Sequence, residues 1–168
     1  METERLLLRG LTDDDFEAVK HIMNSPHVTE VWRHSFGDDD VRGWITRNRQ
    51  AHMRDGFGYM LACDKQTGEP VGQAGLLHED FGFGPVVGIG YILAFEKEGR
   101  GYASEMARYL AGYALEKPDI DAVYCDIRPK NTGSVAVARR LGMEEIGAFT
   151  KIYREIPMEH LIFRLKKQ

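Results

Sequence analysis

The segment of this chain with the clearest chemical potential is residues 98–103, EGRGYA, which lies between a β-branched run and a long amphipathic stretch. Two glycines, Gly99 and Gly101, let the backbone turn tightly and approach a ligand without an obstructing Cβ. The N–H groups at the start of a helix, with the macrodipole behind them, form an anion site, and Arg100 could add a charged donor. The segment indicates phosphate binding, with a simple strand-to-helix turn as the alternative.

Two familiar nucleotide sites do not fit this segment. A Rossmann fingerprint requires G-x-G-x-x-G within a βαβ unit, whereas Ser104 takes the last glycine position here. Asp119 and Asp121 lie at a suitable distance for a ribose partner, but they border a strand in a turn. A phosphate loop of the GK[ST] type is absent from the sequence.

Composition indicates one globular domain spanning residues 1–168, with 43% hydrophobic and 29% charged residues. A net charge of −4 argues against a nucleic-acid partner, and the apolar runs are too short to cross a membrane. The N-terminus lacks the features of a secretion signal. Cys63 and Cys125 fit reduced core thiols, so we expect a cytoplasmic protein.

Hydrophobic periodicity and turn residues predict the elements that position these groups. Strands are expected at 4–9, 57–64, 70–77, 86–93, 120–127, 143–148 and 157–165, and helices at 13–25, 38–54, 101–116 and 131–141. The acidic runs at 13–15 and 38–40 are explained better by helix N-termini than by a metal, so no metal is expected. This order predicts an α/β protein of the α+β type, with helices on the faces of a mixed sheet.

Two ordered motifs then resemble the Gcn5-related N-acetyltransferase (GNAT) superfamily, and its RimJ/RimL-like branch in particular. Gly99 and Gly101 match the glycines of Q/R-x-x-G-x-G/A, with Glu96 in the first position. The second block, P-x-N-x-x-S followed by a basic-Leu-Gly ending, is matched by Pro129, Asn131, Ser134 and Arg140-Leu141-Gly142. The opening TERLLLR and the terminal PMEHLIFRL extend the resemblance over nearly the whole chain.

The resemblance implies a single N-acetyltransferase domain with about four helices and a mostly antiparallel seven-stranded sheet whose fourth and fifth strands splay apart. It also implies acetyl-CoA as co-substrate, with the backbone amides of Gly99, Arg100, Gly101, Tyr102 and Ala103 on the pyrophosphate. Further coenzyme contacts would come from Tyr91, Ile92 and Leu93 along the pantetheine and acetyl group, from Asn131 and Ser134, and from Arg139 or Arg140 at the nucleotide end.

Acetyl transfer passes through a tetrahedral oxyanion and expels a thiolate. The backbone N–H near Leu93 is the candidate oxyanion donor. Ser134 is the candidate hydroxyl that assists the leaving thiol, whose reference pKa is about 8.5. Helix capping or exposure is the alternative explanation of this serine.

The attacking amine must be neutral, which costs about 4.6 kcal/mol at pH 7 for a lysine and about 1.1 kcal/mol for an α-amine. Glu159 and His160 on the last strand are candidate bases, and their opposite faces allow only one of them to enter the cleft. His78-Glu79-Asp80 after the third strand is another polar cluster, which is interpreted as a loop. Tyr153 could donate a proton, with an aromatic on an edge strand as the preferred interpretation.

The acceptor is the least determined part. Trp32 and Phe36 could line its pocket or could cover the core. We expect a protein N-terminus or a small amine, with an aminoglycoside or a polyamine as alternatives, and a non-catalytic coenzyme-A-binding module as the alternative from another class. Edge strands near the C-terminus could pair in a homodimer.

Overall fold

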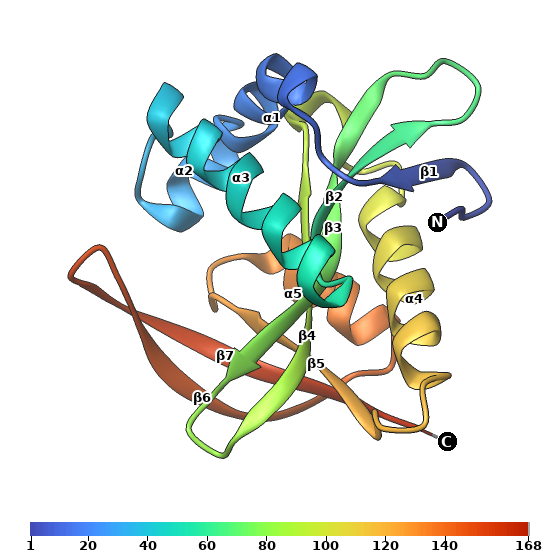
Figure 1. Cartoon of the computed structure of the whole chain (residues 1–168). Helices are drawn as coiled ribbons and strands as arrows, with labels where there is room; N and C mark the ends of the chain where they lie inside the picture. The colour runs from blue at the N-terminus through green and yellow to red at the C-terminus, as the bar shows by residue number, and fades with distance from the viewer. Residues whose placement is uncertain (168) are drawn as a thin grey trace.

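A seven-stranded mixed sheet, in the order β1-β2-β3-β4-β5-β7-β6, runs through the computed structural model, which describes residues 1–167 (Figure 1). The strands are β1 (Leu6–Arg9), β2 (Gly58–Asp64), β3 (Pro70–Asp80), β4 (Pro85–Leu93), β5 (Ala122–Ile127), β6 (Glu144–Tyr153) and β7 (Ile156–Lys166). The helices are α1 (Phe16–Met23), α2 (Pro26–Trp32), α3 (Asp38–Asp55), α4 (Tyr102–Leu115) and α5 (Thr132–Arg140), with 3₁₀ turns η1 (Asp13–Asp15) and η2 (Phe95–Lys97). Within residues 1–167, every helix falls short of the length or apolarity needed to cross a membrane.

Helices cover both faces of the sheet, and β2 and β3 have buried side chains on both sides. In β2, Met60 and Ala62 belong to the core that contains α4 and α5, whereas Leu61 and Cys63 belong to the core beneath α1, α2 and α3. This alternation follows from the two-residue period of a strand. The predicted arrangement of helices on the two faces of a mixed sheet is confirmed.

The centre of the sheet is its least paired part. β4 and β5 are parallel and share only the register pairs Val87–Val123 and Gly88–Tyr124. On its other side β4 pairs with β3 from Pro85 through Leu93, and β5 pairs with β7 along its whole length. The predicted splay of these two strands is thus confirmed, and it leaves backbone groups of both strands without a strand partner.

Several elements differ from the sequence-based expectation. Residues 26–32, expected as part of a connection, form α2, because Pro26 stands at the start of the helix, where its missing N–H costs nothing. The chain therefore has five α-helices rather than about four. β3 continues to Asp80 and β6 continues to Tyr153, three and five residues beyond the expected ends. Pairing of Asp80 with Pro85 and of Tyr153 with Ile156 holds these extensions.

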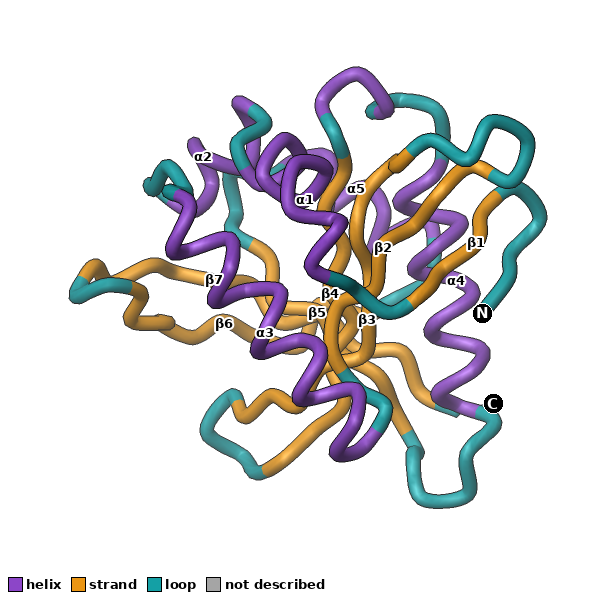
Figure 2. Tube along the Cα trace, turned by 45° about the horizontal axis from the view of Figure 1, so that its top comes forward, coloured by secondary structure: helices purple, strands orange, loops and turns teal. Residues whose placement is uncertain are grey.

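The β6–β7 hairpin extends past the other strands on the side of α3 (Figure 2). Its turn places Arg154 and Glu155 at φ values of 48° and 65°, the left-handed pair of a type I′ turn. Arg154 also forms an ion pair with Asp40 in the first turn of α3. The tip of the hairpin is therefore fixed against the helical layer.

A half-buried ion pair fixes the start of the helical layer to β1. Asp15 is only 6% exposed and accepts hydrogen bonds from both terminal nitrogens of Arg9, at 2.8 and 2.6 Å, and from the N–H of Thr12 at 2.7 Å. Burial by itself would raise the pKa of Asp15, but the hydrogen bonds from Arg9 and Thr12 outweigh it and lower that pKa below its ordinary value.

We expect Asp15→Asn to lower the free energy of unfolding by about 1–3 kcal/mol at pH 7, because hydrogen bonds to a charged group are lost. A carboxyl with a lowered folded pKa contributes stability above its unfolded pKa of about 3.9, and this contribution is lost as pH falls through the folded pKa. Urea unfolding at pH 7 and at pH 3 checks this, with the exposed Asp14→Asn as control. An equal loss at both pH values would contradict it.

Candidate active site

A cavity of ≈310 Å³ lies at the point where β4 and β5 separate. One wall comes from β4, residues 89–92, and the opposite wall from residues 125–128 and the start of α5. Side chains of α2, α3, β2 and β3 and of the β6–β7 hairpin close the rest. Segments from the whole length of the chain therefore meet in this cavity.

The glycine-rich loop at the N-terminus of α4 has the conformation that anion binding requires. Gly99 and Gly101 have φ values of 70° and 81°, which a residue with a Cβ rarely adopts, and Gly101 is the N-cap of α4. Within residues 1–167, the backbone N–H groups of 99–103 donate to no protein acceptor. These five donors and the positive end of a 14-residue helix are groups that can bind an anion.

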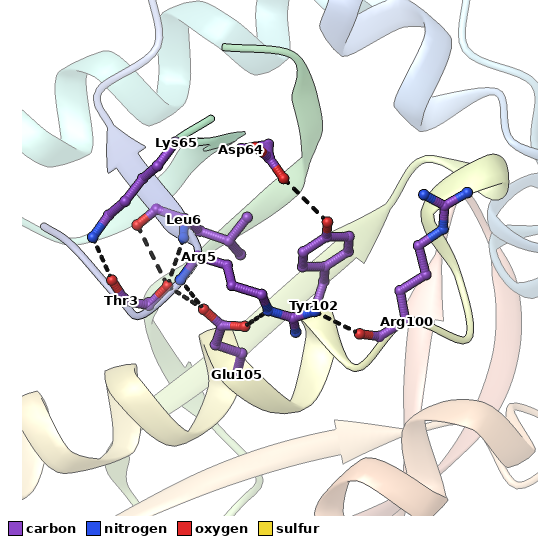
Figure 3. Close-up of polar contacts among 8 residues, drawn as sticks. All are labelled: Thr3, Arg5, Leu6, Asp64, Lys65, Arg100, Tyr102 and Glu105. Carbon is purple, nitrogen blue, oxygen red and sulfur yellow. Dashed lines mark hydrogen bonds and ion pairs between the residues drawn. The ribbon is translucent and has the colours of Figure 1, made fainter. Parts of the chain in front are cut away.

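The segment before β1 holds this loop in place (Figure 3). Arg5 donates from Nη1 to the carbonyl of Arg100 at 3.0 Å and from Nε to Glu105 Oε2 at 2.6 Å. Thr3 Oγ1 donates to the other oxygen of Glu105 at 2.5 Å. The Arg5 guanidinium also lies 4.4 Å from the centre of the Tyr102 ring. Residues about 100 positions apart thereby fix the loop and the first turn of α4 together.

The predicted loop residues divide into backbone and side-chain contributions. The Tyr102 side chain is buried and its hydroxyl donates to Asp64 Oδ2 at 3.2 Å, so only its N–H can face a ligand. Arg100 is exposed. Arg140 Nη1 lies 3.4 Å from Ser104 Oγ on the first turn of α4, whereas Arg139 faces Glu145. Of the two candidate arginines, Arg140 is the one beside the loop.

The start of α5 presents a free hydroxyl to the cavity. Asn131 caps the helix, and its Oδ1 accepts the N–H of Ser134 at 3.1 Å. The Tyr91 hydroxyl donates to the Ser134 carbonyl at 3.3 Å, which ties β4 to α5 across the splay. Within residues 1–167 the Ser134 hydroxyl has no hydrogen-bond partner, and all three residues line the cavity. Asn131 caps the helix, so capping, the alternative explanation of Ser134, does not explain why a serine stands at position 134.

The backbone N–H that faces the cavity lies two residues before Leu93, the residue expected to supply the oxyanion donor. Ala94 donates its N–H to Val71 of β3 at 3.0 Å, so the alternation of an antiparallel ladder turns the N–H groups of Leu93 and Tyr91 toward β5. Tyr91 lines the cavity, but Leu93 is buried and does not. The N–H that faces the cavity therefore belongs to Tyr91 rather than to Leu93. Ile92 also lines the cavity, as expected.

Only one of the two candidate bases on β7 faces the cavity. Met158 and His160 line it, while Glu159 between them is exposed on the opposite face. The expectation of Glu159 as a base is therefore not supported, because strand alternation directs it away from the site. Nδ1 of His160 lies 3.0 Å from the Met158 carbonyl, Nε2 lies 4.0 Å from Asp126, and burial lowers the pKa of His160.

Aromatic side chains from α2, α3, β2 and β6 line part of the cavity. Trp32 lines the cavity and makes edge-to-face contacts with Trp44 at 6.0 Å and with Tyr153 at 5.3 Å between ring centroids. Tyr153, expected as a simple edge aromatic, also lines the cavity. Phe36 does not, because it is buried in the core beneath α1, α2 and α3. Of the two predicted acceptor residues, only Trp32 reaches the site.

A charged cluster in the cavity was missed at the sequence level. Lys151 Nζ lies 3.0 Å from Asp126 Oδ2 and 3.7 Å from Glu79 Oε2, so β6, β5 and β3 each contribute one group. Burial would lower the pKa of Lys151, but the two carboxylates raise it overall. Glu79 follows Leu77 by two residues and both line the cavity, so continuing the expected strand beyond Leu77 could have revealed it.

Comparisons with known proteins agree on one family. The model of the family described as "Acetyltransferase (GNAT) domain" matches residues 5–144. YkkB of Bacillus subtilis (strain 168), named an uncharacterized protein, is 30% identical over 142 residues, which are 84% of this chain and 83% of YkkB. An acetyltransferase structure from Agrobacterium tumefaciens has 29% identity and a TM-score of 0.78, covering 98% and 92% of the two chains. A GNAT-family acetyltransferase from Bacillus anthracis has 22% identity and a TM-score of 0.83, covering 99% and 98%.

We expect Arg5→Ala to weaken coenzyme A binding about tenfold, because losing the hydrogen bond that holds the loop costs about 1.4 kcal/mol. Isothermal titration calorimetry measures the dissociation constant, and Arg47→Ala on the exposed face of α3 is the matched control. Unchanged affinity in Arg5→Ala would show that the loop keeps its conformation without this contact.

Proposed function

The chain belongs to the GNAT acetyltransferase family and is an acyltransferase, and on this premise we propose that it moves the acetyl group of acetyl-CoA to a primary amine in the cavity between β4 and β5. The observation that carries the proposal is the cavity at the point where β4 and β5 separate, which Ser134 lines. The loop with the free N–H groups of 99–103 follows β4 and η2 in the chain.

The coenzyme would lie along the splay. Its pyrophosphate would accept hydrogen bonds from the N–H groups of 99–103, with Arg140 beside its nucleotide end. The pantetheine would pair with the open edge of β4 near Leu93, as an added strand does, and would pass Asn131 at the start of α5. The thioester would then lie beside Tyr91 and Ser134.

The neutral amine would attack the thioester carbonyl carbon and form a C–N bond. The N–H of Tyr91 would stabilise the resulting oxyanion. Collapse of this intermediate would break the C–S bond while the nitrogen loses one proton. The Ser134 hydroxyl would donate a hydrogen bond to the departing sulfur, or would give it a proton and regain the one that the nitrogen loses. The products are an N-acetyl amide and coenzyme A.

The fold leaves the acceptor to be identified by experiment, because one fold serves many substrates. Solved structures with this fold include an aminoglycoside acetyltransferase with coenzyme A, the ribosomal L7/L12 α-N-protein acetyltransferase RimL and a spermidine N-acetyltransferase, all 15–20% identical. We propose a protein N-terminus or a small amine as acceptor, since deprotonating an α-amine costs about 1.1 kcal/mol at pH 7.

A thiol-release screen over peptides with varied N-termini, polyamines, aminoglycosides and free amino acids tests the proposal. Acetyl-dependent release with one of these classes identifies the acceptor. Binding of acetyl-CoA in a calorimeter without release by any amine would instead support a non-catalytic coenzyme-A-binding module. If the chain did not bind acetyl-CoA at all, both the acetyltransferase and the coenzyme-A-binding module would be overturned.

We expect Ser134→Ala to lower kcat about 10²-fold, because the leaving thiolate loses its proton donor. The dissociation constant for acetyl-CoA should change little, since Asn131 rather than Ser134 caps α5. Steady-state kinetics with the identified amine checks this, and the exposed Ser35→Ala is the control. Full activity in Ser134→Ala would remove this hydroxyl from the mechanism.

A further inference from the structure

We propose that Glu79 pairs with the ammonium group of the acceptor and takes its proton, a role that rests on the proposed acetyl transfer. Sequence reasoning left Glu79 in a loop, and the family motifs do not include it. The structure places it at the end of β3, in the wall of the cavity.

Glu79 is a cavity carboxylate without a hydrogen-bond donor. Its side chain is 20% exposed, and within residues 1–167 no protein group donates a hydrogen bond to it. Lys151 Nζ stands 3.7 Å away, beyond hydrogen-bond distance, and donates instead to Asp126 at 3.0 Å. Glu79 is therefore ion-paired with Lys151 but keeps lone pairs that no protein group within residues 1–167 uses. An ammonium group entering the cavity can donate hydrogen bonds to them.

Two glycines of β4 make room for this arrangement. Glu79 pairs with Val86 and leans along the strand, so that a Cβ at Gly88 would lie 2.8 Å from Glu79 Cγ. A Cβ at Gly90 would lie 2.1 Å from the Tyr59 hydroxyl. Gly88 is also the last residue of β4 that pairs with β5. The Glu79 side chain therefore lies over β4 at Gly88, where the strands begin to separate, in the cavity that Tyr91 and Ser134 also line.

Asp126 and His160 of the cavity have hydrogen-bond partners, and Tyr59 is disfavoured as a base by burial. Asp126 of β5 accepts from Lys151 of β6, and His160 of β7 has its Nδ1 at 3.0 Å from a backbone carbonyl. Tyr59 of β2 is buried, and burial raises its pKa further above the physiological range. Burial also raises the pKa of Glu79; Lys151 opposes this rise and Asp126 adds to it. A carboxylate with a raised pKa is a better proton acceptor.

The step balances as follows. The ammonium gives one proton to the Glu79 carboxylate, and the neutral nitrogen attacks the thioester carbon. As the C–S bond breaks, the nitrogen loses its second proton and the thiolate gains one. Glu79 then releases its proton to solvent, so the products are the acetamide, coenzyme A with a free thiol, and one proton.

Glu79→Gln keeps the shape of the side chain and removes its charge. We expect kcat/KM for the amine to fall about 10²-fold or more, with the dissociation constant for acetyl-CoA and the melting temperature unchanged. Since Glu79 must be deprotonated to act, wild-type kcat/KM should fall on the acid side as Glu79 protonates, and this limb should disappear in Glu79→Gln. Glu116→Gln, which removes an exposed charge at the end of α4, is the matched control.

Gly88→Ala tests the same group sterically, because the added methyl displaces the Glu79 side chain while leaving its charge. It should lower kcat/KM and leave acetyl-CoA binding unchanged. Gly112→Ala, whose added Cβ meets nothing within 4 Å, should change neither quantity. Wild-type kcat/KM in Glu79→Gln would overturn the inference, as would loss of acetyl-CoA binding in that variant. Failure of the wild-type chain to bind acetyl-CoA would instead refute the proposed function.

Discussion

The separation of β4 from β5 after Gly88 is the constraint on which the rest of this structure depends. Parallel neighbours in the middle of a sheet ordinarily pair along their length, yet these two share only two register pairs. Each strand is held on its outer side instead, β4 by β3 and β5 by β7. The sheet thus tolerates an unpaired internal edge, whose free backbone groups can pair with an extended ligand.

Contacts from distant parts of the chain hold the ends of this opening. At the loop before α4, Arg5 joins the carbonyl of Arg100 to the carboxylate of Glu105, so the segment before β1 and α4 position the loop together. Across the opening, the Tyr91 hydroxyl reaches the Ser134 carbonyl. Neither contact is local in sequence. The site is therefore a product of the whole fold, and the coenzyme loop alone would not be held in this conformation.

The loop before α4 and the cavity differ in their charge. The loop offers backbone N–H groups and a helix dipole to an anion. The cavity places Glu79, Asp126 and Lys151 among aromatic side chains, with only one of the two carboxylates hydrogen-bonded to the lysine. In the proposed reaction, this difference would give each reactant its own electrostatic environment. Small residues are needed at Gly88 and Gly90 of β4 for a steric reason, because side chains from β3 and β2 lie over these positions.

The sequence by itself determined the order of most elements, the glycine loop before α4, the capped helix after Asn131 and the family, because each of these is encoded within one contiguous segment. Strand alternation also showed that only one of Glu159 and His160 could face the cleft. Which one does so, how far β3 and β6 extend, and whether Trp32 or Phe36 reaches the cavity were decided by tertiary structure. The cluster of Glu79, Asp126 and Lys151 was decided in the same way, because its members lie on three strands whose register is set by long-range pairing and is not written in any local pattern.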